Sequence, residues 1–448
     1  MAKKYLIETF GCQMNFHDSE RMAGLLEQAG FEPTLDESDA EVIVINTCSV
    51  REGAQEKLFS RLGEIRAASA CTGHHPTVAV TGCVAQQEGE KILTRSPVVG
   101  VVIGTQAIKR LPMLVAQKGE GSCGTSATRD SVVDINPYED VSFPLGVTRR
   151  SDPLKAYVTI IEGCNDFCAF CVVPYTRGHE RMRPATEILA EVQEAVDGGR
   201  VEIHLLGQIV NHYQAPDDPS CDFAALLDRV SRIRGVQRIR FASPHPRHVT
   251  RRLIEAVRDL SQVCKHLHLP VQSGSTTVLR AMRRRHTREE YLELVATIRE
   301  AVPGIALSTD MIVGFPGETP EDFEQTLSLV RAVGYHSMFS FKYSPRPNTL
   351  AIKRMPDDVT EVEKTARIVA LQTLQREIQL EIHGATVGKV VDVLVDSRSR
   401  RHDEDLAGRT TGNTVVNFPG RPEWLGRTIQ VRVDRAGPNS LWGTPLLA

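Results

Sequence analysis

The chain has 448 residues, of which 41% are hydrophobic and 24% charged, which is ordinary for a globular protein of roughly two to four domains. The formal net charge of −3 does not indicate a nucleic-acid-binding protein, although a local basic patch could still bind a polyanion. No apolar run approaches the roughly 20 residues of a membrane helix, and the polar start does not resemble a signal peptide, so we expect a cytoplasmic protein with no membrane partner.

Residues 4–104 alternate short apolar runs with helical patterns. This order predicts an open parallel α/β sheet covered by helices. The expected strands are Lys4–Thr9, Val42–Asn46 and Thr77–Thr81, and the expected helices are Ser19–Gln28 and Ala54–Ala67.

One cysteine follows each of these three expected strands, namely Cys12, Cys48 and Cys83. Ligands of open α/β sheets bind beyond the carboxyl ends of the strands, so the three cysteines should meet at one edge. In a reducing compartment, cysteines more often bind metal, catalyse or are buried than form disulfides. A single cysteine of this kind is more often a small buried hydrophobe, but three at equivalent places predict a metal site.

Residues 105–150 are interpreted as a connector. The stretch 119–130 is rich in Gly, Ser and Thr, and a polar stretch with a proline follows it. Cys123 lies in this connector and is interpreted as a bystander thiol. The predicted N-terminal domain therefore covers residues 3–119, and the central domain is predicted over residues 150–380.

The central domain repeats the strand–helix alternation six times. Six units are too few for a complete eight-unit barrel, so we expect a curved, incomplete (β/α)6 barrel with its site at the carboxyl ends of the strands. The expected strands are Ala156–Glu162, Val201–Gly207, Gln237–Ala242, His266–Pro270, Gly304–Val313 and His336–Phe341. The expected helices include Thr186–Val196, Phe223–Ile233, Arg288–Ala301 and Pro320–Val333.

A C-x3-C-x2-C loop directly follows the first of these strands, with Cys164, Cys168 and Cys171 as its cysteines. Cysteine thiolates hold iron–sulfur clusters, and three of them would leave one iron of a four-iron cluster open for chemistry. The alternative is a zinc site completed by a histidine such as His179. That alternative is disfavoured because zinc sites usually pair their ligands at other spacings.

Glycine and polar residues also follow other strands of the expected barrel. Gly207 ends the second strand, Gln208 comes after it, and Gln272 follows the fourth strand. There they could hold a nucleoside-like cofactor or could simply form turns. Arg177, Arg181 and Arg183 lie just beyond the cysteine loop and could meet phosphate. A second basic run, Arg283–Arg285 with His286, is as readily a solvated helix face.

The last part of the chain begins with a long amphipathic helix, expected over Asp357–His383. Residues 383–448 then change to short β-rich segments with glycine turns, which predicts a small closed β-barrel. Such barrels often bind nucleic acid, although an inert appendage is the alternative. The expected strands are Lys389–Asp396, Arg409–Val416, Thr428–Val433 and Ser440–Gly443.

Taken together, these motifs resemble the methylthiotransferase family of radical S-adenosylmethionine enzymes. The resemblance spans nearly the whole chain and is strongest to the members that modify isopentenylated adenine in tRNA. It rests on the strings Glu8–Asn15, Asn46–Arg51, Thr81–Gln86, Glu162–Gly178, His268–Ser275 and Gly408–Thr410.

The resemblance implies two [4Fe-4S] clusters. The cluster on Cys164, Cys168 and Cys171 would bind S-adenosylmethionine, with Gly207, Gln208 and Gln272 among the cofactor contacts, and would cleave it to a 5′-deoxyadenosyl radical. That radical would remove hydrogen from C2 of N6-isopentenyladenosine at position 37 of tRNA. The second cluster, on Cys12, Cys48 and Cys83, would deliver a methylated sulfur to C2, which would give 2-methylthio-N6-isopentenyladenosine. The terminal barrel resembles a TRAM domain, an RNA-binding module.

The same resemblance implies further partners and leaves alternatives open. A flavodoxin- or ferredoxin-like electron donor and a sulfur or iron–sulfur donor system would be required. The family also includes enzymes that act on threonylcarbamoyladenosine in tRNA or on an aspartate of a ribosomal protein. A different class of protein, a non-catalytic iron–sulfur or zinc protein that binds RNA, is the second alternative.

Overall fold

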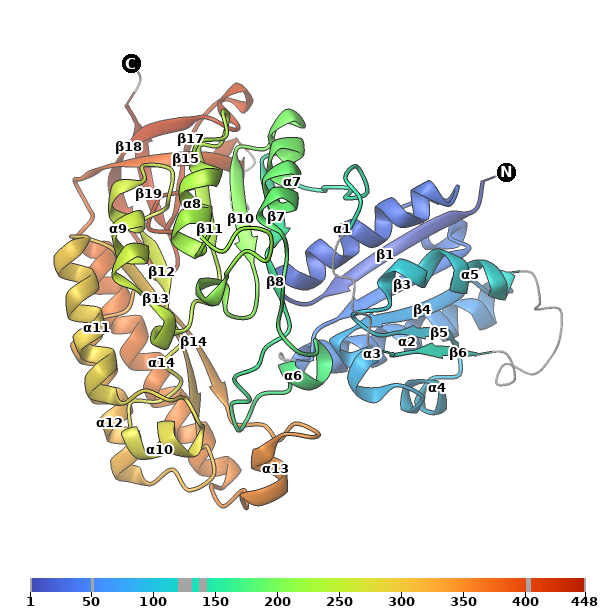
Figure 1. Cartoon of the computed structure of the whole chain (residues 1–448), viewed down its shortest axis with the longest axis horizontal. Helices are drawn as coiled ribbons and strands as arrows, with labels where there is room; N and C mark the ends of the chain where they lie inside the picture. The colour runs from blue at the N-terminus through green and yellow to red at the C-terminus, as the bar shows by residue number, and fades with distance from the viewer. Residues whose placement is uncertain (1, 50–51, 120–130, 137–142, 400–403, 447–448) are drawn as a thin grey trace.

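The computed structural model describes residues 2–49, 52–119, 131–136, 143–399 and 404–446, which form three bodies (Figure 1). Val50 and Arg51 of the second cysteine motif and Cys123 of the predicted connector lie outside the described residues. None of the helices in the described ranges is long and apolar enough to cross a membrane.

The first body is a parallel sheet with the strand order β2-β1-β3-β4-β5-β6, as expected for an open α/β domain. Its strands are β1 (Lys4–Phe10), β2 (Glu32–Pro33), β3 (Val42–Thr47), β4 (Thr77–Gly82), β5 (Val99–Ile103) and β6 (Val132–Asp134). Its helices are α1 (Gln13–Gln28), α2 (Glu52–Thr72), α3 (Cys83–Glu88), α4 (Lys91–Arg95) and α5 (Leu111–Gly119).

Strand β3 shows why this sheet reads as continuous apolar runs. Its residues point alternately to two separate cores, with Val42 and Val44 packed against the α1 and α5 side and Ile43 and Ile45 against the α2 side. Both faces are covered, so neither set of side chains can be polar. The sheet also extends beyond the predicted limit of residue 119, because β6 pairs with β5 from within the stretch interpreted as a connector.

The second body is the incomplete barrel that the six strand–helix units predicted. Strands β7-β10-β11 and β12-β13-β14 are parallel in chain order, and a bridge between Ile239 and Val263 joins the two sets. The strands are β7 (Lys155–Thr159), β10 (Glu202–Leu206), β11 (Arg238–Phe241), β12 (His266–His268), β13 (Ala306–Val313) and β14 (Ser337–Lys342), with a short ribbon of β8 (Ile161–Glu162) and β9 (Arg181–Met182).

The helices around the barrel begin at caps that the sequence encodes. Thr287 and Glu290 form a capping box at α11, and Thr319 and Asp322 form one at α12, so both helices start and end where the sequence predicted. The helices are α6 (Val173–Thr176), α7 (Ala185–Asp197), α8 (Phe223–Ser231), α9 (Arg251–Asp259), α10 (Thr276–Ala281), α11 (Arg288–Ala301), α12 (Pro320–Val333) and α13 (Leu350–Arg354).

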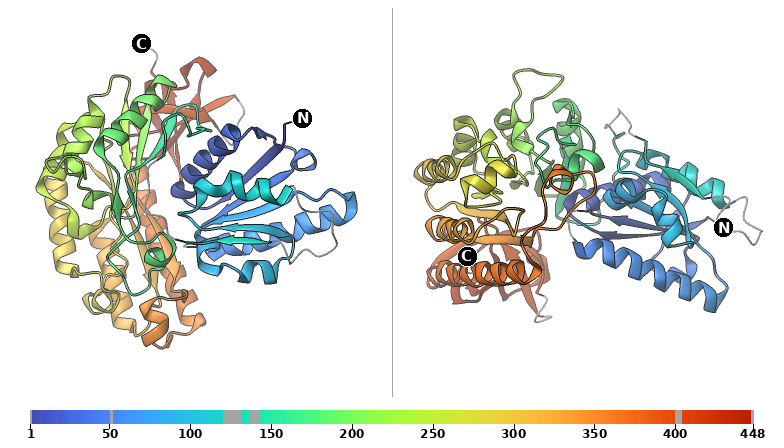
Figure 2. Two further views of the ribbon diagram at one scale, coloured as in Figure 1. Left: turned by 45° about the vertical axis from the view of Figure 1, so that its right-hand side comes forward. Right: turned by 90° about the horizontal axis from the view of Figure 1, so that it is seen from below.

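The N-terminal domain lies beside the open side of the barrel (Figures 1 and 2). Helix α1 contacts β7, and α3 contacts α6, the short helix that follows the cysteine loop. The carboxyl end of the N-terminal sheet therefore faces the segment that carries the cysteine loop.

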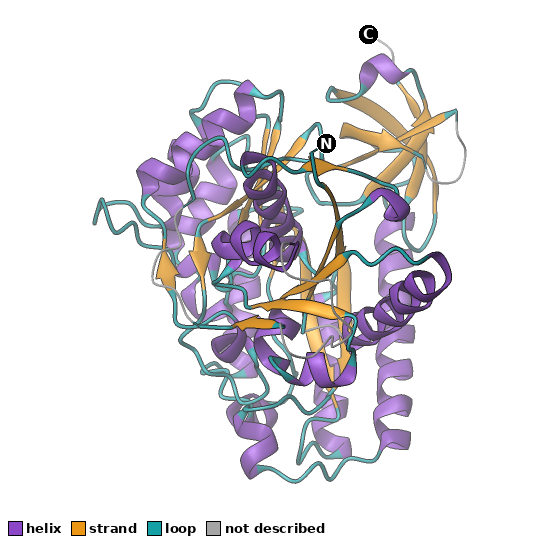
Figure 3. Cartoon of the chain, turned by 90° about the vertical axis from the view of Figure 1, so that its right-hand side faces the viewer, coloured by secondary structure: helices purple, strands orange, loops and turns teal. Residues whose placement is uncertain are grey.

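Helix α14 (Glu361–Gly384) runs along β14 and leads into the third body, a closed barrel with the strand order β15-β16-β17-β19-β18 (Figure 3). The strand predicted at Arg409–Val416 is wrong. Thr410 and Thr414 close a turn there, and Asn413 has a φ of +70°, which ends one strand and starts the next. The strands are β15 (Val390–Arg398), β16 (Asp405–Arg409), β17 (Val415–Pro419), β18 (Thr428–Ala436) and β19 (Leu441–Pro445).

This small barrel docks on the amino ends of the strands of the large one. Arg240 Nη2 donates to the Thr410 carbonyl (2.8 Å), and Arg238 donates to the carbonyl of Arg409. Lys155 Nζ pairs with Asp396 Oδ2 at 2.9 Å. The contacts place the small barrel at the end of the large barrel opposite the cysteine loop.

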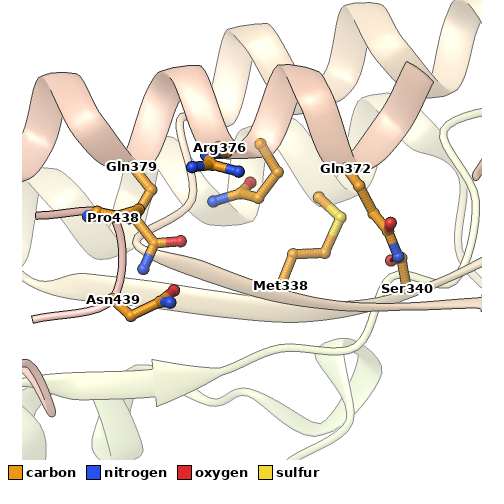
Figure 4. Close-up of a pocket in the computed structure, with 8 residues that line it drawn as sticks. Met338, Ser340, Gln372, Arg376, Gln379, Pro438 and Asn439 are labelled. Carbon is orange, nitrogen blue, oxygen red and sulfur yellow. Dashed lines mark hydrogen bonds between the residues drawn. The ribbon is translucent and has the colours of Figure 1, made fainter. Parts of the chain in front are cut away.

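A cavity of about 250 Å³ lies between β14, α14 and the turn before β19 (Figure 4). Its lining includes Met338, Gln375 and Asn439. None of the predicted site residues lines it, so it is separate from the cysteines described next.

Candidate active site

The sheet order brings the three N-terminal cysteines to one edge, as their positions after three strands predicted. Strands β1, β3 and β4 are neighbours, and Phe10, Thr47 and Gly82 pair in register at their carboxyl ends. Cys12 follows as the N-cap of α1, Cys48 directly follows β3, and Cys83 is the first residue of α3. Cys48 and Cys83 are buried.

The backbone at Gly82 can only be formed by glycine. Its φ is +91°, and a Cβ there would lie 2.4 Å from Asn46 Oδ1 and 2.6 Å from the Thr47 carbonyl oxygen. Asn46 in turn joins β3 to α1, because it accepts from Asn15 Nδ2 (2.9 Å) and donates to the Asn15 carbonyl (2.8 Å). These contacts hold the segments that carry the three cysteines close together.

The electrostatic surroundings of these thiols are uneven. A hydrogen bond from Cys48 lowers the pKa of Cys12 to about 6 in spite of its burial, and the guanidinium of Arg177 contributes to that lowering. Burial raises the pKa of Cys83, and Arg177 opposes that rise. Arg177 comes from the barrel, so the edge of the N-terminal sheet is completed by the second domain.

Three buried hydroxyls lie one or two residues from these cysteines, at the ends of β3 and β4 and just after β3. Thr47 Oγ1, Ser49 Oγ and Thr81 Oγ1 have no hydrogen-bond partner among the described residues. Buried polar atoms are normally paired, so these hydroxyls are available to an acceptor at this edge. Three soft thiol donors with spare hydroxyl donors match the needs of an iron–sulfur cluster.

The C-x3-C-x2-C loop is fixed at both ends. At Gly163, φ is +80° and a Cβ would lie 2.1 Å from the His179 carbonyl oxygen, and the N–H of Cys164 donates to the Gly178 carbonyl (3.1 Å). At the other end the N–H of Ala169 donates to the Met282 carbonyl (2.9 Å). The His179 ring, a candidate ligand in the zinc interpretation, instead contacts Asn165 Oδ1 at 3.1 Å.

Burial dominates the titration of two thiols of the C-x3-C-x2-C loop. It raises the pKa of Cys164 to about 11 and that of Cys171 to about 12. A bound metal deprotonates coordinating thiols outright, so these residues become thiolates when they act as ligands. In the described parts of the chain, no three Cys, His, Asp or Glu side chains are arranged around a single metal ion.

Arg284 also contacts this loop, and the sequence did not identify it. Its Nη1 donates to Cys168 Sγ (3.6 Å) and its Nη2 donates to the Pro270 carbonyl (2.6 Å). Its neighbours Arg283 and Arg285 have positive φ values and are exposed, so the basic run is not a solvated helix face. The sequence does not show that burial alternates along this run, with Arg284 buried between two exposed arginines.

The segment 176–178 joins the cysteine loop to the N-terminal domain. Thr105 Oγ1 donates to the Thr176 carbonyl (2.6 Å), and Gln106 Nε2 donates to the Arg177 carbonyl (2.8 Å). The Arg177 guanidinium pairs with Asp18 Oδ2 at 2.7 Å. The two cysteine sets are therefore linked through about three residues of backbone.

The predicted phosphate-binding role of Arg177 and Arg183 is wrong. Both are nearly fully buried, with exposed fractions of 4% and 2%. Arg183 Nη1 lies 2.6 Å from Glu191 Oε2, and His17 of α1 contacts the other oxygen of Glu191 at 3.2 Å. Arg183 joins α7 to β7, and Arg177 joins α1 to the segment after α6, so these buried side chains cannot meet an RNA phosphate.

The predicted cofactor contacts lie around the mouth of the barrel. A Cβ at Gly207 would lie 3.2 Å from Ile161 Cβ, so the strand end packs closely on the base of the cysteine loop. Gln208 Oε1 is buried and has no hydrogen-bond partner within the described chain. Gln272 has a φ of +77° and its N–H donates to the Asp310 carbonyl (3.0 Å). Their contacts with a cofactor stay a prediction.

Two aromatic side chains project from the cysteine loop region, and the sequence pattern does not distinguish them from core aromatics. Phe167 is 37% exposed and Tyr175 is 42% exposed, and their rings meet edge to face at 6.4 Å. Phe167 has a φ of +47°, which is rare for a bulky residue and places strain beside the candidate cluster. Lys353 Nζ lies 5.8 Å from the Tyr175 ring centroid. Exposed rings beside a cation form a surface suited to a nucleobase.

Three family models match separate parts of the chain. They are Uncharacterized protein family UPF0004 over residues 4–104, the Radical SAM superfamily over 158–330 and the TRAM domain over 384–446. A solved structure of similar fold is the radical S-adenosylmethionine methyltransferase TsrM from Kitasatospora setae, with a TM-score of 0.55 and 15% identity, covering 87% of this chain and 79% of that one.

Curated relatives match over the full length. The tRNA-2-methylthio-N(6)-dimethylallyladenosine synthase of Solibacter usitatus is 44% identical over 99% of this chain and 98% of the relative. The protein of the same name from Thiobacillus denitrificans is 46% identical over 98% of each. The chain belongs to the family of tRNA-2-methylthio-N6-dimethylallyladenosine synthases.

Proposed function

We propose that this chain methylthiolates C2 of N6-isopentenyladenosine at position 37 of tRNA, giving 2-methylthio-N6-isopentenyladenosine. The observation that carries the proposal is the pairing of two cysteine sets on two domains. Each set follows the carboxyl ends of parallel strands, and the segment 176–178 holds them together. Family membership supports the reaction and the substrate.

The residues present fit two [4Fe-4S] clusters and S-adenosylmethionine. Cys164, Cys168 and Cys171 would hold the first cluster. The second set, Cys12, Cys48 and Cys83, would hold the other cluster. When bound, these groups supply the one-electron chemistry that replaces an unactivated aromatic hydrogen and the methylated sulfur that takes its place.

The protein's own side chains would bind and orient the substrate. Phe167 and Tyr175 would stack on bases of the anticodon loop, because base–aromatic stacking does not require a particular sequence. Lys353 stands beside Tyr175, where an ammonium can meet a backbone phosphate. The target adenine would leave the base stack so that its C2 can reach the two candidate cluster sites, as other base-modifying enzymes require.

The mouth of the barrel would hold S-adenosylmethionine. Gln208 Oε1 offers a buried acceptor without a protein partner among the described residues. Gly207 and Gln272 shape the backbone beside it. A flavodoxin- or ferredoxin-like electron donor and a sulfur donor system complete the proposal, and we place the protein in the cytoplasm.

The test is a comparison of two triple variants with wild type after iron and sulfide loading. Wild type should carry about eight iron atoms per chain and cleave S-adenosylmethionine under reductant. Alanine at Cys164, Cys168 and Cys171 should abolish cleavage. Alanine at the second cysteine set (Cys12, Cys48, Cys83) should spare cleavage and abolish sulfur insertion. The exposed Cys71→Ala is the matched control and should behave as wild type.

Survival of cleavage in the first triple variant would contradict the assignment of the two sites. Eight iron atoms in the second triple variant would show that its cysteines hold no cluster. A protein that binds iron and RNA but never cleaves S-adenosylmethionine would support the non-catalytic alternative.

A further inference from the structure

Arg177 stands between the two candidate cluster sites. It lies six residues after Cys171, and the next residue, Gly178, accepts the N–H of Cys164 (3.1 Å). Its guanidinium enters the N-terminal domain, where it pairs with Asp18 Oδ2 (2.7 Å). Arg177 directly follows α6, which packs against α3, the helix that begins at Cys83. The barrel therefore contributes a cation to the cysteine set of the other domain.

Because this ion pair is buried, its charges interact strongly with nearby groups. Arg177 is 4% exposed and Asp18 is 2% exposed. Burial lowers the pKa of Arg177, but Asp18, Cys83 and Glu162 raise it well above the ordinary value, so the side chain stays charged. Charges interact far more strongly in a protein interior than in water. Asp18 Oδ1 has no hydrogen-bond partner among the residues described.

We propose that Arg177 is a positioning residue of the second cluster, a cation from the radical SAM domain that stabilises the reduced form of the cluster on Cys12, Cys48 and Cys83. The Asp18 carboxylate holds the guanidinium in place, and its negative charge has the opposite effect on the cluster. The inference rests on the proposed function, because it takes those three cysteines as cluster ligands.

The sign of the effect follows from electrostatics. A cluster becomes more negative when it accepts an electron, so a nearby cation raises its reduction potential and a nearby anion lowers it. Net charge and hydrogen bonds to sulfur are known determinants of cluster potentials. Loss of the Arg177 charge should lower the potential, and loss of the Asp18 charge should raise it.

The backbone around Arg177 is held by contacts that do not involve its side chain. Thr105 and Gln106 donate to the carbonyls of Thr176 and Arg177. A neutral side chain such as methionine keeps these contacts and much of the volume, so the fold of the segment should persist. The substitution therefore tests charge more than backbone structure.

The experiment uses the full chain with alanine at Cys164, Cys168 and Cys171, so that the second cluster gives the only spectroscopic signal. Iron content and the midpoint potential from a redox titration followed by electron paramagnetic resonance are measured. Arg177→Met should lower the midpoint, Arg177→Lys should lower it less, and Asp18→Asn should raise it. Arg283→Met, at an exposed arginine on the barrel, is the control and should leave it unchanged.

Unchanged midpoints in both Arg177→Met and Asp18→Asn, with about four iron atoms retained, would overturn the inference. If Arg177→Met loses its iron, Asp18→Asn still decides the sign. Failure of the proposed function looks different, because the cluster would then remain after alanine replaces Cys12, Cys48 and Cys83.

Discussion

Replacing Glu191 with glutamine should weaken the packing of the N-terminal domain against the barrel. Glu191 lies on α7, is 5% exposed and faces three partners: Arg183 Nη1 at 2.6 Å, Arg150 Nη2 at 3.1 Å and His17 Nε2 at 3.2 Å. His17 belongs to α1, the helix that Cys12 caps. The carboxylate therefore joins the second cysteine set to the barrel wall.

The expected magnitude comes from the burial of the network. Removing one partner of a buried ion pair costs about 3–5 kcal/mol, because the remaining charges stay desolvated and unpaired. Glu191→Gln takes the carboxylate at 2.6 Å away from Arg183, which is 2% exposed, and leaves it the longer contact with Glu187. Glu187 on the same helix is the matched control, since it is 38% exposed and lies 3.8 Å from Arg183 Nε. Because that contact is long and Glu187 is partly exposed, we expect the pair to contribute about 0–1 kcal/mol.

The assay is urea unfolding of the cluster-loaded chain, combined with product analysis. With a urea m-value of about 3 kcal/mol/M, Glu191→Gln should lower the midpoint by about 1 M or more. Glu187→Gln should lower the midpoint by about 0.3 M at most. We also expect Glu191→Gln to cleave S-adenosylmethionine with little methylthiolation, because α1 positions Cys12. Equal midpoints for the two variants would refute the reasoning.

Three further outcomes follow from single residues. Burial lowers the pKa of His17 to about 4, below an unfolded value of about 6.5, so the unfolded state binds the proton more readily and acid favours unfolding. In urea unfolding, the stability lost between pH 7 and pH 5 should be about 2 kcal/mol smaller for His17→Asn than for wild type. Gly82→Ala should lose about half of the iron, because its Cβ would meet Asn46 and the Thr47 carbonyl, and iron analysis measures this loss. Phe167→Ala and Tyr175→Ala should each raise KM for prenylated RNA about tenfold, since stacking contributes about 1–3 kcal/mol per base, and leave S-adenosylmethionine cleavage unchanged.

Much of the fold was predictable because buried parallel strands are continuous apolar runs. Strands β1, β3 and β4 and the barrel order follow from that pattern, and with them the meeting of three cysteines at one sheet edge. β5 was missed, since Gly100 interrupts its run, and β2 has only two residues. The terminal strands were misplaced where Gly412 and Asn413 form a turn inside an alternating pattern.

The partners of buried charges were not predictable. Arg177 and Asp18 are 159 residues apart, and nothing local distinguishes an arginine that pairs in the interior from one that meets phosphate. The same holds for Arg284, which contacts Cys168 across 116 residues. Sequence pattern assigns residues to strands and helices, whereas pairing across two domains depends on how the finished surfaces meet.

The most direct test of the central claim is nucleoside analysis of tRNA from cells that lack this chain. Those cells should contain N6-isopentenyladenosine without its 2-methylthio group, and wild type should restore 2-methylthio-N6-isopentenyladenosine. The variant with alanine at Cys12, Cys48 and Cys83 should not restore it. An unchanged 2-methylthio-N6-isopentenyladenosine level in the deleted cells would contradict the account, as would loss of methylthio groups from threonylcarbamoyladenosine or a ribosomal aspartate instead.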